Sequence, residues 1–196
     1  MSLFTIGHSN HDWPRFLELL RQHEITAIGD VRSAPYSAYN PQYNRESLAE
    51  LLRREKIAYV HLGRELGARR EEPECYDPTG RVQFDRVLES PLFQSGLQRV
   101  REGLRRFRIA LMCAEKDPLE CHRCLLISRA VRREFPKLAH IREQGRLEAQ
   151  SDLETRLIHH CDLPTRDLFR TREELVHDAF QHLSGEVAFR LSEASP

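Results

Sequence analysis

The stretch of sequence that decides the fold is IALMCAEKDPLECHRC, residues 109–124. Its first four residues are apolar, as in a short buried strand, and Cys113 follows at once. Pro118 stops the strand from continuing and helps the chain to fold back. A helical apolar pattern then extends from about residue 120 to residue 135. The stretch therefore predicts a strand, a turn and a helix in succession.

The same alternation of strand and helix continues outward in both directions. Short β-rich runs predict further strands at residues 3–7, 25–31, 57–62 and 138–141. This order favours an α/β fold with a mostly parallel sheet and helices on both faces. From residue 147 onward the pattern is helical and polar. We therefore expect an α/β domain over residues 1–150 and a helical C-terminal extension over residues 151–196.

Composition narrows the class of protein. The chain has 196 residues, of which 40% are hydrophobic and 31% charged, which excludes a disordered or low-complexity protein. The formal net charge is +0, which argues against broad binding to duplex nucleic acid or to an anionic membrane. No apolar run is long enough to span a membrane, and no secretory signal is visible at the N-terminus. With five cysteines and no disulfide framework expected, we predict a cytoplasmic protein without a membrane partner.

Polar and nucleophilic residues follow four of the predicted strands. In open parallel sheets, ligands bind at the carboxyl ends of the strands, so we expect these residues to share one rim. The alternative is that each of them only caps a helix or satisfies loop amides. The residues are His8 and Ser9 after the first strand, Asp30, Arg32 and Ser33 after the second, His61, Arg64 and Glu65 after the third, and Cys113 after the fourth.

The cluster of Cys113, Cys121 and Cys124 leaves three interpretations open. In the first, Cys113 or Cys121 is a nucleophile or redox centre, with His8 or His122 as the proton carrier. In the second, the three thiols, together with His122 or His8, bind zinc or an iron–sulfur cluster, although a second Cys-x2-Cys pair is missing. In the third they are small buried hydrophobes, which suits Cys124 best. No cofactor is predicted, and a metal on Cys113, Cys121 and Cys124 is the lesser alternative.

The start of the helix after Cys113 is the second element of the predicted site. Cys121, His122 and Arg123 are expected in its first turn, where backbone N–H groups favour an anion and lower the pKa of a thiol. Arg123 would add a fixed positive charge beside a thiolate or a bound anion.

Several separated motifs resemble one family. They are TIGHS at residues 5–9, DVRSAPYS at 30–37, LG at 66–67, LMCAEKDP at 111–118, CHR at 121–123, and HI at 140–141 followed by Gly145. Over about residues 3–150 the chain resembles the bacterial and archaeal family called domain of unknown function 488. The resemblance implies a compact α/β domain, with motif positions on the predicted rim, and its name assigns no reaction. Relatives have Leu-Gly-Gly where this chain has Leu66-Gly67-Ala68, and Cys124 lies outside the motif, which weakens a metal role for it.

We therefore expect an enzyme that uses cysteine thiol chemistry on a small or nucleotide-like anionic substrate. The expected catalytic residues are Cys113, Cys121, His8, His122 and Asp30, and the expected ligand-binding residues are Ser9, Arg32, Ser33, Tyr36, Glu115, Lys116 and Arg123. Arg32 and Arg123 would hold the anion.

The alternative is a non-catalytic module that binds a ligand or nucleic acid in the same pocket. Tyr36, Tyr39 and Tyr43 would then stack on bases, next to a basic patch within residues 99–108. The charged loop at residues 68–81 has little apolar surface to bury, so we expect it to be mobile and able to act as a lid.

Overall fold

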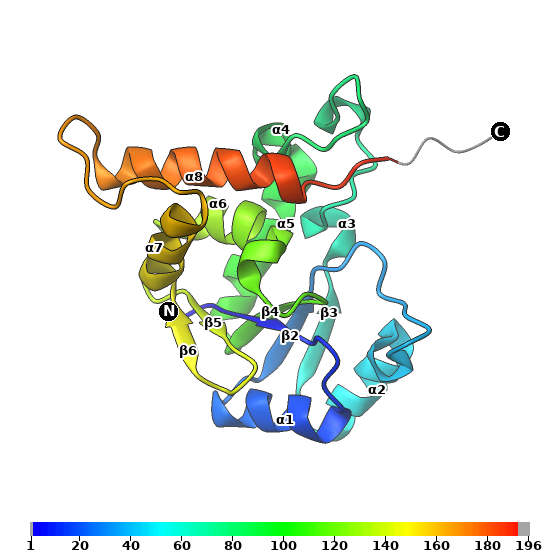
Figure 1. Ribbon diagram of the computed structural model, residues 1–196. Coiled ribbons are helices and arrows are strands. Elements are labelled where there is room, and N and C mark those ends of the chain that lie inside the picture. The colour runs from blue at the N-terminus through cyan, green and yellow to red at the C-terminus, as the bar shows by residue number, and fades with distance from the viewer. Residues whose placement is uncertain (1, 192–196) are drawn as a thin grey trace.

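The protein is built around one six-stranded sheet (Figure 1). The computed structural model describes residues 2–191. The strand order is β3-β2-β4-β1-β5-β6; β6 is antiparallel to β5, and every other pairing is parallel. This confirms the predicted α/β class. The strands are β1 (Phe4–Gly7), β2 (Ala27–Asp30), β3 (Ala58–His61), β4 (Ile109–Cys113), β5 (Ala139–Ile141) and β6 (Leu147–Ala149).

Helices cover both faces of the sheet, and α1 and α2 lie on the opposite face from α5 (Figure 1). The α-helices are α1 (Trp13–Gln22), α2 (Arg45–Arg54), α3 (Gly63–Leu66), α4 (Phe84–Glu89), α5 (Pro91–Leu104), α6 (Arg129–Val131), α7 (Gln150–His160) and α8 (Arg172–Val187). A π-helix, η4 (Arg123–Ser128), precedes α6, and short 3-10 helices occur at η1 (Pro41–Tyr43), η2 (Pro73–Cys75) and η3 (Pro118–Glu120).

Local sequence signals start several of these helices. The Asp12 side chain accepts a hydrogen bond from the backbone of Arg15, which caps α1, and a proline stands in its first turn. Ser90 caps α5 in the same way, directly before Pro91. Thr171 and Glu174 form a reciprocal capping box at the start of α8. These caps satisfy backbone N–H groups that have no partner within the helix.

The central strand β4 separates two hydrophobic cores. Ala110 and Met112 belong to the core under α1 and α2, whereas Leu111 and Cys113 belong to the core under α5 and the C-terminal helices. Successive side chains of a strand point to opposite faces, so the unbroken apolar run of β4 fills both cores. The thiol of Cys113 thus lies on the same face as α5.

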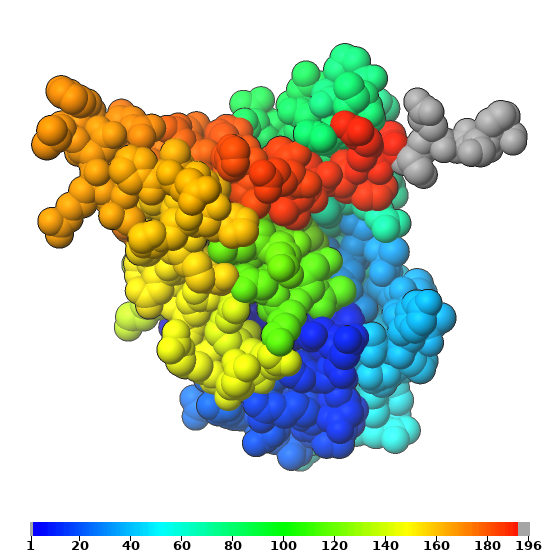
Figure 2. Space-filling model, viewed as in Figure 1, coloured from blue at the N-terminus to red at the C-terminus, as the bar shows by residue number. Residues whose placement is uncertain are grey.

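The segment after β5 differs in part from the prediction. Residues 147–149, expected to be helical, form the edge strand β6, because Glu148 pairs with His140 of β5. Helices α7 and α8 do form, and their buried residues belong to the same core as Cys113. In Figure 2 the C-terminal helix, orange to red, lies across the green middle part of the chain. In the described residues, no helix is both long and apolar enough to cross a membrane.

The loop at residues 68–81 is held in place more firmly than its composition indicates. Cys75 is fully buried in the core under α5, where a loosely packed loop was expected. The side chain of Arg70 is buried and donates to the carbonyl of Glu65 at 2.7 Å. Backbone bonds join Val82 to Phe189 and Leu191 to Gly80, so the end of the described chain pairs with this loop. The prediction of a loop that buries little apolar surface is wrong, because charged residues alternate here with buried anchors.

Candidate functional site

The parallel sheet brings all four predicted strand ends together at one rim, because His61 at the end of β3 pairs with Asp30 of β2. Gly7 of β1 pairs with Cys113 of β4, and Asp30 of β2 pairs with Met112 of β4. Beyond the strands, the backbone N–H of His8 donates to the carbonyl of Cys113 at 2.9 Å. His8, Asp30 and Cys113 therefore lie on one edge, as their positions after parallel strands predict.

At this rim two thiols meet one imidazole. Nδ1 of His122 lies 3.6 Å from Sγ of Cys113 and 3.7 Å from Sγ of Cys121. Nε2 of His122 donates to the carbonyl of Val31 at 3.1 Å, so in the neutral ring the lone pair of Nδ1 points at the two sulfurs. Both sulfurs and a ring nitrogen of His122 lie within 4.8 Å of one another, and all three residues are buried.

Cys121 reaches this position from an extended backbone. Its φ and ψ are −141° and 140°, and the π-helix η4 begins only at Arg123. The prediction that Cys121 lies in the first turn of a helix is therefore wrong. The extended residue turns its side chain toward Cys113, whereas the helix that follows carries Cys124 into the core. A π-helix is uncommon and occurs often near functional sites.

The electrostatic environment lowers the pKa of one thiol and raises the pKa of the other. Burial opposes ionisation of Cys113, but a hydrogen bond from Cys121 and the positive charge of His122 hold the pKa of Cys113 below its ordinary value. Burial and the neighbouring Cys113 raise the pKa of Cys121 well above its ordinary value. Burial opposes protonation of His122, but the negative charges of Cys113 and Glu115 and the hydrogen bonds of the ring together raise its pKa. The arrangement thus favours a thiolate at Cys113 beside an imidazolium at His122.

Glu115 lies against the same thiols. Sγ of Cys113 donates to Oε2 of Glu115 at 2.6 Å when the thiol is protonated. Burial opposes ionisation of this carboxyl group, but hydrogen bonds from Cys113 and Cys121 hold its pKa below the usual value. Its negative charge in turn disfavours the thiolate of Cys113. Glu115 therefore raises the pKa of Cys113, whereas His122 lowers it, and the balance between the two sets the fraction of Cys113 that is thiolate.

Asp30 and Arg32 form a buried ion pair at the side of the thiol cluster. Nε and Nη2 of Arg32 donate to the two carboxylate oxygens of Asp30 at 2.9 Å and 2.7 Å. The hydroxyl of Tyr59 donates to the same carboxylate, and the carbonyl of Tyr43 accepts from Arg32. The pair is bidentate and nearly inaccessible to solvent, so Asp30 orients Arg32 and neutralises most of its charge.

His8 is part of this second network and not of the thiol cluster. Its Nδ1 donates to the carbonyl of Ser9, so Nε2 is free to accept from Nη1 of Arg32 at 3.3 Å. Its ring stacks on the ring of Tyr43 with the centroids 4.1 Å apart. Burial lowers the pKa of His8 to about 4. Of the two candidate proton carriers, His122 contacts the sulfurs, and His8 positions Arg32.

A cavity of about 350 Å³ opens beside the thiols. Six residues of the predicted set line it: Arg32, Ser33, Cys113, Glu115, Cys121 and His122. The remaining lining residues include Arg69, Glu120, Val187 and Phe189. The cavity thus joins the thiol cluster to the loop at residues 68–81 and to the end of α8.

Arg69 is the cation of this cavity that the sequence reasoning missed. Its guanidinium lies 4.7 Å from the ring centroid of Phe189, and its backbone N–H donates to Oγ of Ser33. Within residues 2–191, Arg69 has no ion pair with a carboxylate. The sequence indicates only that Arg69 lies in a charged loop, and its contact with a residue 120 positions away leaves no signal in the sequence.

Arg123 is not brought to the cavity, contrary to the prediction. It is fully buried, and its Nη2 donates to the carbonyls of Glu115 and Lys116 at 2.9 Å each. Its Nε and Nη1 have no partner in the described structure. Arg123 therefore supports the loop after Cys113 through the two hydrogen bonds that its Nη2 donates to backbone carbonyls.

Three further members of the predicted ligand-binding set lie outside the cavity lining. Lys116 forms an ion pair with Glu143, and the hydroxyl of Tyr36 donates to Glu46 at 2.9 Å. Ser9 has a φ of 48°, and its carbonyl fixes the ring of His8. These residues are satisfied by other parts of the chain, which a reading of strand ends does not reveal.

A cluster of charged side chains clamps the loop that carries the thiols. Asp117 accepts hydrogen bonds from Arg142 and from Arg156, which lie in the turn after β5 and in α7. Both arginines also contact Glu148 of β6. The two arginines hold the pKa of Asp117 well below its usual value against the opposing effect of burial. The clamp ties the C-terminal part of the chain to the loop between Cys113 and Cys121.

Part of the surface predicted for the nucleic-acid alternative is engaged in contacts within the chain. Tyr43 is fully buried, and its hydroxyl donates to the carbonyl of His11, so it cannot stack on a base. Arg99 and Arg101 of the basic patch form ion pairs with Glu65 and Glu134. Tyr39 is almost fully exposed, with 96% of its surface accessible, and Tyr36 is exposed as well. Tyr43 is therefore not available for the predicted stacking on bases, whereas Tyr36 and Tyr39 remain exposed.

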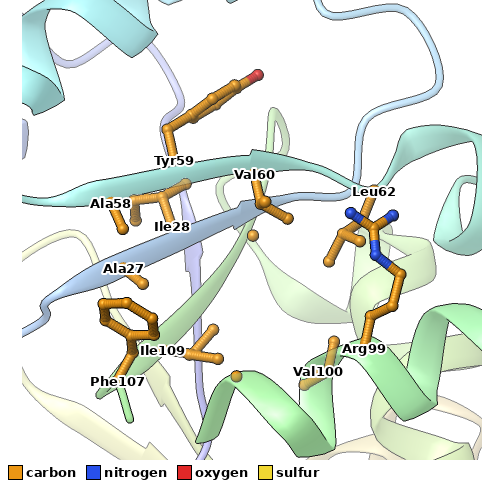
Figure 3. A pocket seen from close by; sticks show the side chains of 12 residues that line it. Ala27, Ile28, Ala58, Tyr59, Val60, Leu62, Arg99, Val100, Phe107 and Ile109 are labelled. Atoms are coloured by element: carbon orange, nitrogen blue, oxygen red, sulfur yellow. The ribbon is translucent and has the colours of Figure 1, made fainter.

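A second hollow lies at the β3 edge of the sheet, away from the thiols (Figure 3). Val60, Val100, Phe107 and Ile109 gather between the strands and α5, and Tyr59 points to the other side of β3. Arg99 is the one arginine that lines it. This hollow is apolar and offers no nucleophile, so the chemistry of the site belongs to the cavity at Cys113.

The fold and site define an α/β protein with a cysteine–histidine cluster at the carboxyl edge of a parallel sheet. The chain belongs to the family described as domain of unknown function DUF488, whose family model matches residues 12–130. The match includes Cys113, Cys121 and His122 and excludes β1 and His8. No curated protein and no solved structure matches the chain significantly.

The site also settles which cysteines converge. Cys124 is fully buried in the core, and burial raises the pKa of its thiol. Among the described residues, the group of metal-ligating atoms that converges is Cys113, Cys121 and His122, without Cys124. A site built on Cys113, Cys121 and Cys124, the lesser alternative at the outset, is not formed.

Proposed function

We propose that the protein is a thiol-dependent enzyme that acts on a small anionic substrate in the cavity beside Cys113. The thiolate sulfur of Cys113 attacks an electrophilic atom of the substrate, and a sulfur–substrate bond forms. The leaving group departs with the bonding electron pair and takes its proton from Nδ1 of His122. Water then attacks the same substrate atom, the sulfur–substrate bond breaks, Cys113 leaves as a thiolate, and one proton of the water returns to Nδ1 of His122.

The observation that carries this proposal is the contact of one imidazole nitrogen with two thiols at the wall of a cavity. A nucleophile and a base within contact distance, with the base oriented by a third group, are the signature of an activated nucleophile. Here the third group is the carbonyl of Val31, which fixes the His122 ring at 3.1 Å. The distances of 3.6 Å and 3.7 Å to sulfur are those of hydrogen bonds to a large acceptor atom.

The anionic character of the substrate is supported by Arg69. Arg69 is exposed at the cavity and has no carboxylate partner among the residues described, whereas Arg32 is neutralised by Asp30. A free guanidinium on the wall of a cavity favours a carboxylate or a phosphate. His122 adds a second positive charge when it is protonated.

The test compares two alkylating reagents of similar size and different charge. In both reactions the sulfur attacks a methylene carbon, the carbon–iodine bond breaks and iodide leaves. We expect the ratio of the iodoacetate rate to the iodoacetamide rate at Cys113 to exceed the ratio for glutathione. Peptide mass spectrometry would locate the adduct, and Arg69→Gln should remove the preference for the anion. Arg166→Gln is the matched control, because Arg166 is also exposed and does not line this cavity.

The same measurement separates the enzyme from a non-catalytic binding module. In a binding module, Cys113 would react no faster than glutathione, while an anion such as phosphate would still protect the cavity. Fast alkylation of Cys113 that is abolished in Cys113→Ser and unchanged in Cys124→Ser supports thiol chemistry. Equal, slow alkylation of Cys113, Cys121 and Cys124 would contradict it.

A further inference from the structure

We propose that Cys113, Cys121 and His122 form a binding site for a thiophilic divalent cation such as Zn²⁺, and that the bound cation switches off the thiols. The binding of the cation stands on geometry alone. The switching rests on the proposed function, because it assumes that the same thiols perform chemistry.

The first support is the spacing of the three ligand atoms. In tetrahedral zinc sites the metal lies about 2.3 Å from sulfur and about 2.0–2.1 Å from nitrogen, which separates the two ligand atoms by about 3.6 Å. Nδ1 of His122 lies 3.6 Å and 3.7 Å from the two sulfurs. All three ligand atoms lie within 4.8 Å of one another, so adjustments of the side chains are enough for them to share one cation.

The second support is the contact behind the imidazole. A metal-binding histidine usually donates its other N–H to a carboxylate or a carbonyl, which fixes the ring and its tautomer. Nε2 of His122 does so with the carbonyl of Val31. Val31 immediately follows β2, so the contact ties the ligand to the rigid sheet. Nδ1 is left with its lone pair toward the two sulfurs.

The ligand types select the class of cation. Two thiolates and one imidazole favour zinc and similar soft ions over magnesium or calcium, which prefer oxygen. Three protein ligands leave a fourth position for an exogenous group, as in open zinc sites. All three residues line the cavity of about 350 Å³, so a small anion or water from the cavity can complete the coordination.

The consequence for the thiols is direct. A thiolate whose lone pair is donated to a metal attacks electrophiles poorly, and removal of the metal restores it. The cluster would thus alternate between a metal-bound, protected state and a metal-free, reactive state.

Cobalt provides the sharpest test, because Co²⁺ occupies tetrahedral zinc sites and absorbs light there. We expect one Co²⁺ per chain, with visible bands of tetrahedral coordination and an intense thiolate-to-cobalt charge-transfer band. Zn²⁺ should displace the cobalt and bleach both. Cys113→Ser, Cys121→Ser and His122→Gln should each weaken binding by more than about tenfold. Cys124→Ser and Cys161→Ser are the matched controls and should keep the spectrum, since neither thiol belongs to the cluster.

A second measurement on the unaltered protein does not depend on the folding of variants. One equivalent of Zn²⁺ should slow alkylation of Cys113 more than about tenfold, and a chelator should restore the rate. A wild-type protein without a thiolate-to-cobalt band, or a band that persists when Cys113 and Cys121 are both serine, would overturn the metal site. If the band is present but chelator-treated Cys113 reacts no faster than glutathione, the proposed function fails and the metal site stands.

Discussion

The ring of His122 donates through Nε2 to the carbonyl of Val31, and this contact aims its other nitrogen at both Cys113 and Cys121. The ring is therefore held by the residue that follows β2, whereas the two thiols that it contacts come from β4 and from the segment before η4. One imidazole thus joins two parts of the chain that are distant in sequence, and the reactivity of both thiols depends on its position.

Replacement of His122 tests this dependence. In metal-free His122→Gln we expect alkylation of Cys113 at neutral pH to slow by roughly 10²-fold, because the neighbouring positive charge is lost. The rate would be followed by mass spectrometry of the peptide that carries Cys113. His177→Gln is the control, since His177 is exposed on α8 and does not line the cavity. An unchanged rate in His122→Gln would show that the imidazole does not activate the thiol.

Oxidation should link the two thiols of the cluster. Because the sulfurs of Cys113 and Cys121 lie within 4.8 Å, a thiol-specific oxidant that accepts two electrons should form one reversible disulfide per chain. Thiol titration would then show the loss of two thiols, and a dithiol reductant would restore them. Cys124→Ser should behave like the wild type, whereas a disulfide that contains Cys124 would contradict the geometry.

The Asp30–Arg32 pair should matter more for stability than any surface pair. Asp30→Asn leaves the Arg32 guanidinium buried without its counter-charge, so we expect a loss of about 3–5 kcal/mol in the free energy of unfolding. Urea denaturation would measure it. Glu50→Gln removes an exposed partner of Arg53 and Arg54 and should change the stability little. Equal losses in the free energy of unfolding in the two variants would show that burial does not strengthen the contribution of the Asp30–Arg32 pair to stability.

Two glycines provide a matched pair of substitutions. A Cβ on Gly7 would lie 1.9 Å from the carbonyl oxygen of Glu115, so Gly7→Ala must displace the loop that follows Cys113. We expect lower stability and altered alkylation of Cys113. Gly185 lies in α8 with nothing near its Cβ position, so Gly185→Ala should stabilise by up to about 1 kcal/mol. Thermal denaturation of both variants would check the opposite signs, and a stable Gly7→Ala with unchanged thiols would contradict the packing.

Stability should fall on mild acidification because of His140. This ring is fully buried between Thr5 and Gln150, and burial lowers its pKa to about 3. Below about pH 6.5 this histidine binds a proton in the unfolded chain, whereas in the folded chain it stays neutral until the pH nears 3. The free energy of unfolding therefore decreases as the pH falls from about 6.5 toward 3. The loss is at most about 1.4 kcal/mol per pH unit for one histidine. Urea denaturation at pH 7 and pH 5 should show a smaller difference in His140→Gln; an equal difference would exclude His140 as the cause.

The positions of strands and their ends could be predicted from sequence, because burial on both faces leaves short apolar runs such as residues 109–112. Parallel pairing then places His8, Asp30 and Cys113 on one edge without further information. What could not be predicted depends on where side chains point. In the sequence, Arg69 and Arg123 both have polar neighbours. In the structure, Arg123 supports a loop from the core, whereas Arg69 faces the cavity.

The order of the strands has a practical consequence for dissecting the protein. β1 lies between β4 and β5 in the middle of the sheet, but it precedes residue 12, where the family match begins. Arg142 and Arg156, which clamp Asp117, come after its end at residue 130. A fragment cut at the family boundaries would keep Cys113, Cys121 and His122 while leaving the backbone of β4 unpaired on one side. Exposed edges of this kind promote aggregation, so a recombinant fragment of residues 12–130 should be insoluble although it carries the whole thiol cluster.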